Sequence, residues 1–174
     1  ELRSAESGAS WGTIGNPDSL LRAAEVLINK AGAKAIAVVA RFPDNLDEEA
    51  EQNYREGNGV DLIAGAEAVI SHLIVREFQI PCAHSPIFSP PPLDANLSPR
   101  SAAEELGYTF LPSVLVGLSR APQFVSKDSN LFPSNNDIWV NQIDAVVVPA
   151  NACGSSALLS LSQSDTQIIT VEEN

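Results

Sequence analysis

The sequence predicts an α/β protein in which a mainly parallel sheet is flanked by helices, with Rossmann-like layering. Two observations lead to this prediction. Helix-like and strand-like segments alternate along the chain, and the stretch 143–171 has the order strand, polar turn, helix, strand that builds parallel sheets. Because right-handed crossovers bring the loops after parallel strands to one edge of the sheet, a ligand site is expected at that carboxyl-terminal edge.

The length and composition predict one folded body. With 174 residues, of which 44% are hydrophobic, the chain can form one globular domain with a core. We predict a polar lead-in over 1–15 and a single α/β domain over 16–174. The sequence contains no methionine, which predicts that it is a processed product or a piece of a longer protein.

The elements are predicted in chain order from caps and periodicity. Asn16 and Pro17 are typical of a helix start, and Gly32 is typical of its end. Residues 108–118 are ambiguous, because β-branched and aromatic residues favour a strand slightly over a buried helix while a proline and a glycine interrupt them. The other predicted elements are a strand at 35–40, a helix at 64–78, a short strand at 80–84, a helix at 98–107, and the strand, helix and strand of 143–148, 157–161 and 168–171.

The charge excludes several classes of partner. Ten Lys and Arg residues against 22 Asp and Glu residues give a formal net charge of −12, which repels nucleic acids and anionic lipid surfaces. No apolar run is long enough to predict membrane insertion. CxxC, HExxH, GxGxxG and GxxxxGK[ST] motifs are all missing, so no metal site is predicted and the cofactor is left open.

A reactive cysteine is the main catalytic prediction. Cys153 follows a predicted strand and is expected at the start of a helix, where the dipole and free amides would stabilise a thiolate. His84 is its predicted proton partner, because imidazole titrates near neutral pH. The competing interpretation makes Cys153 a small buried residue that packs a turn.

Six further residues are predicted to bind an anionic ligand at the same edge. Arginine side chains bind carboxylates in a bidentate manner, although a salt bridge would explain an arginine equally well. Amides and a Gly-Ser helix start offer hydrogen-bond donors. An acid after the last strand is typical of residues that bind ribose hydroxyls. The six residues are Arg41, Arg120, Asn151, Gly154, Ser155 and Glu172.

Several stretches of the chain resemble one known family. The resemblance lies in residues 35–44, 80–84, 107–112, 116–122 and 152–154, and it is to the uncharacterised DUF3326 family. The resemblance covers nearly the whole chain but implies only the C-terminal half of a longer family protein. It also implies a setting in the chloroplast stroma or the cyanobacterial cytoplasm. It implies no activity, so no catalytic role comes from it.

The leading functional hypothesis is an α/β enzyme or binding domain for a small anionic metabolite. A racemase, isomerase or hydrolase would use such residues, and whether the protein is an enzyme is left open. The alternative is a non-catalytic subunit of a larger plastid or cyanobacterial assembly, with a protein complex or a homo-oligomer as its state. A third interpretation is a nucleotide-binding regulatory module.

Overall fold

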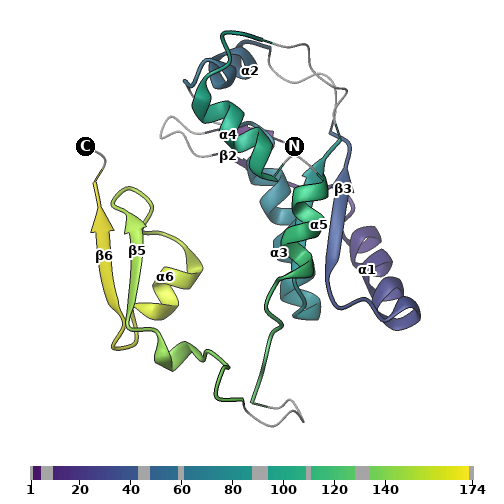
Figure 1. Ribbon diagram of the computed structural model, residues 1–174, viewed down its shortest axis with the longest axis vertical. Coiled ribbons are helices and arrows are strands. Elements are labelled where there is room, and N and C mark those ends of the chain that lie inside the picture. Colours follow the sequence, from purple (N-terminus) through teal and green to yellow (C-terminus); the bar gives the residue numbers. More distant parts are fainter. Residues whose placement is uncertain are drawn as a thin grey trace. The chain divides into compact units, whose positions relative to one another are not determined.

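The computed structural model describes residues 2–4, 10–42, 48–58, 61–87, 94–108, 111–127 and 134–172. These residues form two compact units, 1–124 and 125–174, and each unit is described by itself. Both units contain helices and parallel strands (Figure 1). The chain therefore has the predicted α/β class, whereas the Rossmann-like layering and the single domain over 16–174 stay predictions.

The first helix forms as its sequence predicts. Helix α1 (Pro17–Ala31) starts behind Asn16, whose side chain accepts a hydrogen bond from the Ser19 amide at 3.2 Å. It ends at Gly32, which adopts a left-handed conformation with a φ of 65° and donates its amide to the Ile28 carbonyl. Glycine fits there because it has no Cβ to clash in that conformation.

A parallel strand pair lies at the centre of the first unit. Strand β3 (Ile36–Ala40) pairs with β4 (Cys82–Pro86), and Val38 lies opposite His84 in this register. Helix α3 (Ala64–Phe78) precedes β4 in the chain and contacts it. Strand β4 starts directly after Pro81, so it lies two residues later in the chain than the short strand predicted at 80–84.

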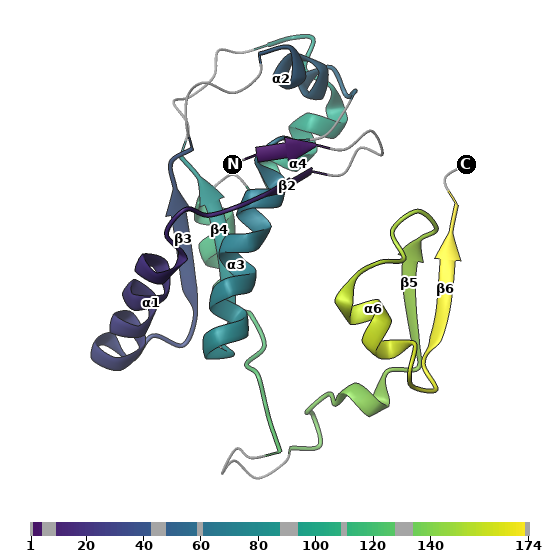
Figure 2. The same cartoon turned by 180° about the vertical axis from the view of Figure 1, so that it is seen from behind.

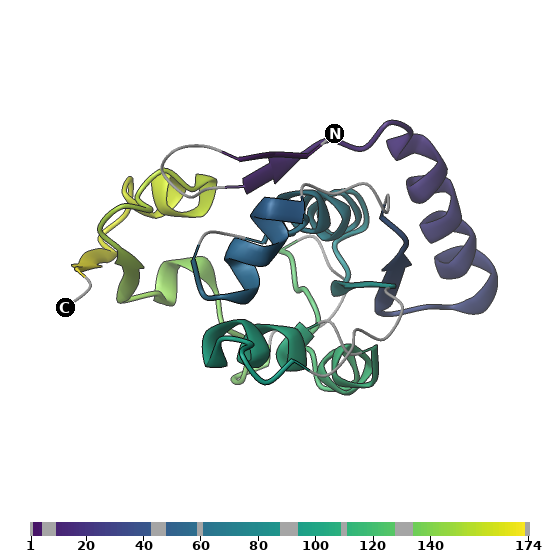
Figure 3. The ribbon, with the colours of Figure 1, turned by 90° about the horizontal axis from the view of Figure 1, so that it is seen from above.

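Helices cover both faces of this pair, as Figure 3 shows from above. Helices α1 and α3 pack on one face, where Ala24, Ile36 and Ile74 form a buried cluster. Helix α5 (Leu111–Ser119) contacts both strands from the other side. The parallel pair is thus covered in the way that buried parallel sheets require.

Residues 111–118 form a helix, so the slight preference for a strand over 108–118 was wrong. Pro112 is the second residue of α5, and a proline is tolerated in the first turn because the amide there needs no intrahelical partner. Leu111, Val114 and Leu118 share one helical face, and Val114 is buried. Burial of this face outweighs the strand propensity of the β-branched residues.

A short antiparallel ribbon lies within the region predicted as a lead-in. Strands β1 (Leu2–Ser4) and β2 (Ser10–Gly12) pair with each other, and β2 lies across α3 (Figure 2). Gly12 is buried against Ala66 of α3. This close approach leaves no room for a side chain at position 12.

The substitution Gly12→Ala is therefore expected to destabilise the protein. A Cβ at Gly12 would lie 2.6 Å from the Ala66 Cβ and 2.9 Å from its Cα, so the ribbon or the helix has to shift. Overpacking of this kind lowers the free energy of unfolding by about 1–3 kcal/mol. Chemical denaturation measures it, with Gly15→Ala as the control, since among the described residues no atom lies within 4 Å of a Cβ there. Equal stabilities of the two variants would contradict the packing.

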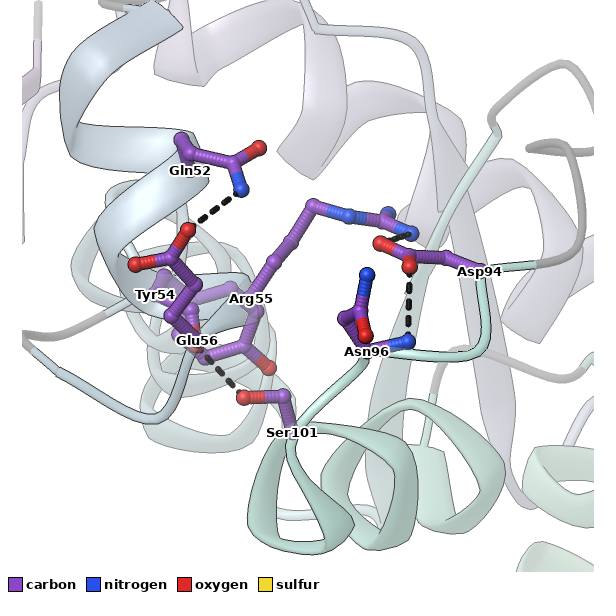
Figure 4. A network of polar contacts seen from close by, with 7 residues as sticks. All are labelled: Gln52, Tyr54, Arg55, Glu56, Asp94, Asn96 and Ser101. Carbon is purple, nitrogen blue, oxygen red and sulfur yellow. Dashed lines mark hydrogen bonds and ion pairs between the residues drawn. The ribbon is translucent and has the colours of Figure 1, made fainter.

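A polar network ties helix α2 (Glu48–Arg55) to helix α4 (Pro99–Tyr108), as Figure 4 shows. Ser101 is fully buried and donates its hydroxyl to the Tyr54 carbonyl at 2.6 Å. Arg55 forms an ion pair with Asp94 at 3.6 Å. These contacts satisfy polar groups between the two helices and involve none of the predicted site residues.

The second unit contains the predicted strand, turn, helix and strand. Strand β5 (Ala145–Pro149) pairs in parallel with β6 (Gln167–Val171), and α6 (Ser156–Leu161) connects them. A short 3₁₀ turn, η1 (Val140–Gln142), precedes β5. Leu158 of α6 is buried, with 4% of its surface exposed. The local prediction for 143–171 is therefore confirmed.

Candidate active site

Two polar side chains lie on the buried stripe of α3. Glu67, Ser71, Ile74 and Phe78 follow one another at spacings of four, three and four residues, which places them on one helical face. Ile74 and Phe78 belong to the apolar core under β3 and β4. Glu67 and Ser71 continue the same stripe toward the amino-terminal end of the helix. The buried face is therefore apolar at one end and polar at the other.

His84 lies opposite these two side chains. Val38, which pairs with His84, and Cys82, which lies two residues before it in the same strand, both pack on the core beside Ile74. His84 therefore belongs to the strand face that α3 covers. Its Nδ1 atom forms a hydrogen bond with the Ser71 Oγ at 2.5 Å, and its Nε2 atom lies 3.9 Å from a carboxyl oxygen of Glu67.

Burial controls the protonation of Glu67. Only 1% of its surface is exposed, and neither carboxyl oxygen has a hydrogen-bond partner among the described residues. Loss of hydration disfavours the charged form, and the nearby Asp61 carboxylate adds repulsion. Together these effects raise the pKa of Glu67 from 4.5 to about 7. Glu67 therefore keeps its proton far more readily than an exposed glutamate does.

The pKa of His84 moves in the opposite direction. Burial lowers the pKa of the imidazole below 6.5, and the positive charge that His72 can bear lowers it further. The usual order is therefore reversed, since the carboxyl group of this pair titrates at a higher pH than the imidazole. Near neutral pH the pair favours a neutral acid beside a neutral base over an ion pair. Pairs of groups whose pKa values are moved in this way are typical of acid–base sites.

Cys82 lies on the same strand face but belongs to the core. It packs against the cluster of Ala24, Ile36 and Ile74, and burial raises the pKa of its thiol to about 11. Since the thiolate is the reactive form, Cys82 is an inert structural thiol near neutral pH.

Cys153 lies in the exposed turn between β5 and α6. Its sulfur is 3.4 Å from the Ala150 carbonyl oxygen and 3.7 Å from that of Pro149, and both contacts have the thiol as donor. Helix α6 begins at Ser156, and its amino-terminal cap is Ser155, which accepts a hydrogen bond from the Leu158 amide. Cys153 thus lies two residues before the cap, outside the helical turn in which it was predicted.

The other predicted residues of the second unit lie at one end of the β5–β6 pair. Pro149 lies opposite Val171, and the Ala150 amide donates to the Val171 carbonyl at 2.9 Å. The turn after β5 and the residue after β6 therefore share the carboxyl-terminal end of this pair. The residues at that end are Asn151, Cys153, Gly154, Ser155 and Glu172, and all of them are exposed.

The two predicted arginines belong to the first unit. Arg41 is exposed and directly follows β3, so it lies at the carboxyl-terminal end of the β3–β4 pair. It lies two residues after Val39, which pairs with Ser85 of β4. Arg120 is exposed and follows α5, where its amide donates to the Gly117 carbonyl. Each unit thus has its own set of predicted residues. Whether Cys153 and His84 act together stays a prediction.

Sequence reasoning missed Glu67 and Ser71. A signal was present, because an acid and a serine occupy the same helical stripe as Ile74 and Phe78. The apolar residues Val69 and Leu73 of the same helix are only half-buried, so apolar character alone does not identify the buried face.

The described residues contain neither a metal-binding cluster nor a helix that could cross a membrane. No cluster of three or more His, Cys, Asp and Glu side chains in these residues has an arrangement that could hold a metal ion. No helix among them has both the length and the apolar character needed to cross a membrane.

Comparison with known proteins supplies the family. A family model described as "Protein of unknown function (DUF3326)" matches residues 1–174. The chain belongs to this family. One relative of the chain is a protein of the cyanobacterium Synechococcus sp. whose name is "uncharacterized lipoprotein". It is 57% identical over 173 residues, which are 99% of this chain but 47% of the relative, so the chain spans about half the relative's length. No solved structure matches the chain.

Proposed function

We propose that this DUF3326 chain is part of an α/β enzyme that transfers a proton to or from a small anionic metabolite, with His84 as the group that contacts the substrate. The observation that supports the proposal most strongly is the buried Glu67 carboxyl group, which has no hydrogen-bond partner among the described residues and lies beside an imidazole. Burial of an unpaired acid destabilises a fold, so its presence favours a functional role over a structural one.

The exposures of the two side chains separate their roles. The side chain of His84 is 24% exposed, so a substrate can reach its imidazole, whereas that of Glu67 is 1% exposed and acts through His84 as a positioning residue. When His84 accepts a proton from the substrate, the resulting imidazolium is stabilised by the Glu67 carboxylate. Ser71 fixes the ring through its Nδ1 atom. Since the carboxylate forms above a pKa of about 7, the rate should rise with pH through that value.

The proposed substrate is anionic because of the predicted ligand residues. Arg41 follows β3 at the carboxyl-terminal end of the β3–β4 pair. Glu67 and Ser71 lie in the part of α3 that is nearest this end. The guanidinium group of an arginine binds a carboxylate well. We include Arg120 as a second anion-binding residue. Cys153 is proposed as a further acid–base or nucleophilic group, and the remaining proposed ligand residues are Asn151, Gly154, Ser155 and Glu172.

Exchange of substrate hydrogen with solvent tests the proposal. The full-length protein is incubated in D₂O with the anionic fraction of a cyanobacterial metabolite extract, and mass spectrometry follows deuterium uptake. We expect at least one small carboxylic acid to gain deuterium at carbon in a protein-dependent manner, with a rate that rises through pH 7. If no metabolite in that fraction gains deuterium over the protein-free control, proton transfer to an anionic metabolite is the wrong function.

A non-catalytic subunit of a larger assembly is the second candidate function. It is favoured by the exposed apolar side chains of both units, among them Leu115, Val116, Val147 and Val171. Such a subunit would co-purify with a complex at fixed stoichiometry and would show no deuterium transfer. We keep the cyanobacterial cytoplasm or the chloroplast stroma as the proposed compartment. Cell fractionation into soluble and membrane fractions would test this compartment.

A further inference from the structure

One face of the β5–β6 pair has no cover among the described residues of its unit. Side chains alternate between the faces of a strand, and Val147 lies opposite Ile169 in the parallel register. The residues that share this face, called here the outer face, are Ala145, Val147, Pro149, Gln167, Ile169 and Val171. All six are exposed, with 62% of Val147, 45% of Ile169 and 52% of Val171 open to solvent.

The opposite face has a partial cover. Val146 and Val148 are half-buried, and Leu158 of α6 is buried with 4% exposed. Figure 1 shows α6 beside β5, with β6 farther from the helix. Within the described part of 125–174, Leu158 and Thr166 are the only buried residues. A parallel sheet is normally buried on both faces, so this pair lacks a layer.

The chemistry of the outer face indicates an apolar partner. Five of its six side chains are apolar, and the sixth is the uncharged Gln167. Although the chain has a net charge of −12, no acidic or basic residue belongs to this face. A nucleic acid, an anionic surface or a charged peptide would find no complementary group there. The face is suited to the apolar stripe of a helix packing on a sheet.

The Synechococcus relative is longer than the matched region, so it contains further segments that could pack on the outer face. The match covers 99% of this chain but only 47% of the relative, so more than half of that polypeptide lies outside the matched region. We infer that a segment of that remaining part, with an apolar face, covers the outer face of the β5–β6 pair within the same full-length molecule. Because the partner is tethered, no separate association step opposes the burial of this face.

Thiol labelling of the full-length protein tests the inference. In a Cys153→Ser background, Val147→Cys places a thiol on the outer face, and Leu159→Cys places a control thiol on α6, where Leu159 is 58% exposed. If the outer face is covered, maleimide should modify position 147 on the order of 100-fold more slowly than position 159, since the reaction then requires local opening. Ile169→Cys repeats the test on β6, in case Val147→Cys impairs folding.

The dependence on protein concentration identifies the occupant. Slow labelling at position 147 in a monomer, unchanged on dilution, together with cross-links from position 147 to peptides outside residues 1–174, supports the inference. Cross-links from position 147 to residues 1–124 would overturn it, because the first unit would then be the cover. Equal rates at positions 147, 169 and 159 would overturn the inference, because the face would then be open. Protection that disappears on dilution, together with a dimer in light scattering, would also overturn it and would identify a second copy as the partner.

Discussion

The substitution His84→Gln is expected to abolish protein-dependent deuterium transfer to the anionic metabolite. Glutamine keeps a polar group in the strand but cannot exchange a proton near neutral pH. Loss of a general acid–base residue lowers the rate by about 10²–10⁴-fold. The full-length variant is compared with the unaltered protein in the same D₂O assay, after circular dichroism has shown that both are folded.

The second histidine of the chain provides a matched control. His72 is exposed on α3, and its charge contributes to the lowered pKa of His84. His72→Gln should therefore retain deuterium transfer while moving the pKa of His84 upward. If folded His84→Gln protein transfers deuterium as fast as His72→Gln protein does, then His84 does not contact the substrate and the proposed function is wrong.

The substitution Glu67→Gln is expected to change how stability depends on pH. Folding raises the pKa of Glu67 from 4.5 to about 7, so the folded state binds this proton more tightly than the unfolded state does. The contribution of protonated Glu67 to the free energy of unfolding is fully present below pH 4.5, and it is lost as the pH rises to about 7. Glutamine does not titrate. We therefore compare the unfolding free energy of the variant with that of the unaltered protein at each pH. The difference, variant minus unaltered protein, should rise by about 2–3 kcal/mol from pH 5 to pH 8.

Other groups contribute to the pH profile without obscuring this difference. The lowered pKa of His84 acts in the opposite sense, because its stability is lost as the pH falls below 6.5, but both proteins contain that histidine. Glu77→Gln on the same helix is the control, since an exposed side chain loses little hydration on folding. Urea denaturation at both pH values measures the effect. A Glu67→Gln profile parallel to that of the unaltered protein would show that burial does not control this carboxyl group.

Local signals in the sequence predicted most of the elements. The cap at Asn16 and the helix end at Gly32 both have the predicted roles, because each depends on neighbouring residues only. The parallel pairing of β5 and β6 also followed from sequence order, since a short connection through a helix favours parallel strands. Residues 111–119 were harder, because β-branched residues are compatible with either state and packing against the strands decided for a helix.

The candidate site was predicted only in part. His84 was identified from its residue type and its place near a strand end, and the structure places it beside Glu67 and Ser71. Those two side chains could not be paired with it from sequence, because the rotation of α3 about its axis depends on tertiary packing. For Cys153 the strand, turn and helix were correct, yet Ser155 caps the helix, so Cys153 lies two residues before the cap and not at the helix start where it was predicted.

Site-specific NMR titration of the Glu67 carboxyl carbon and the His84 imidazole tests the central claim most directly. The buried pair should titrate in reversed order, with Glu67 near pH 7 and His84 below pH 6.5, and replacement of Glu67 by glutamine should remove the carboxyl transition. Titration of Glu67 near pH 4.5, with His84 at or above pH 6.5, would contradict the account, because the site would then contain an ordinary exposed acid and no poised acid–base pair.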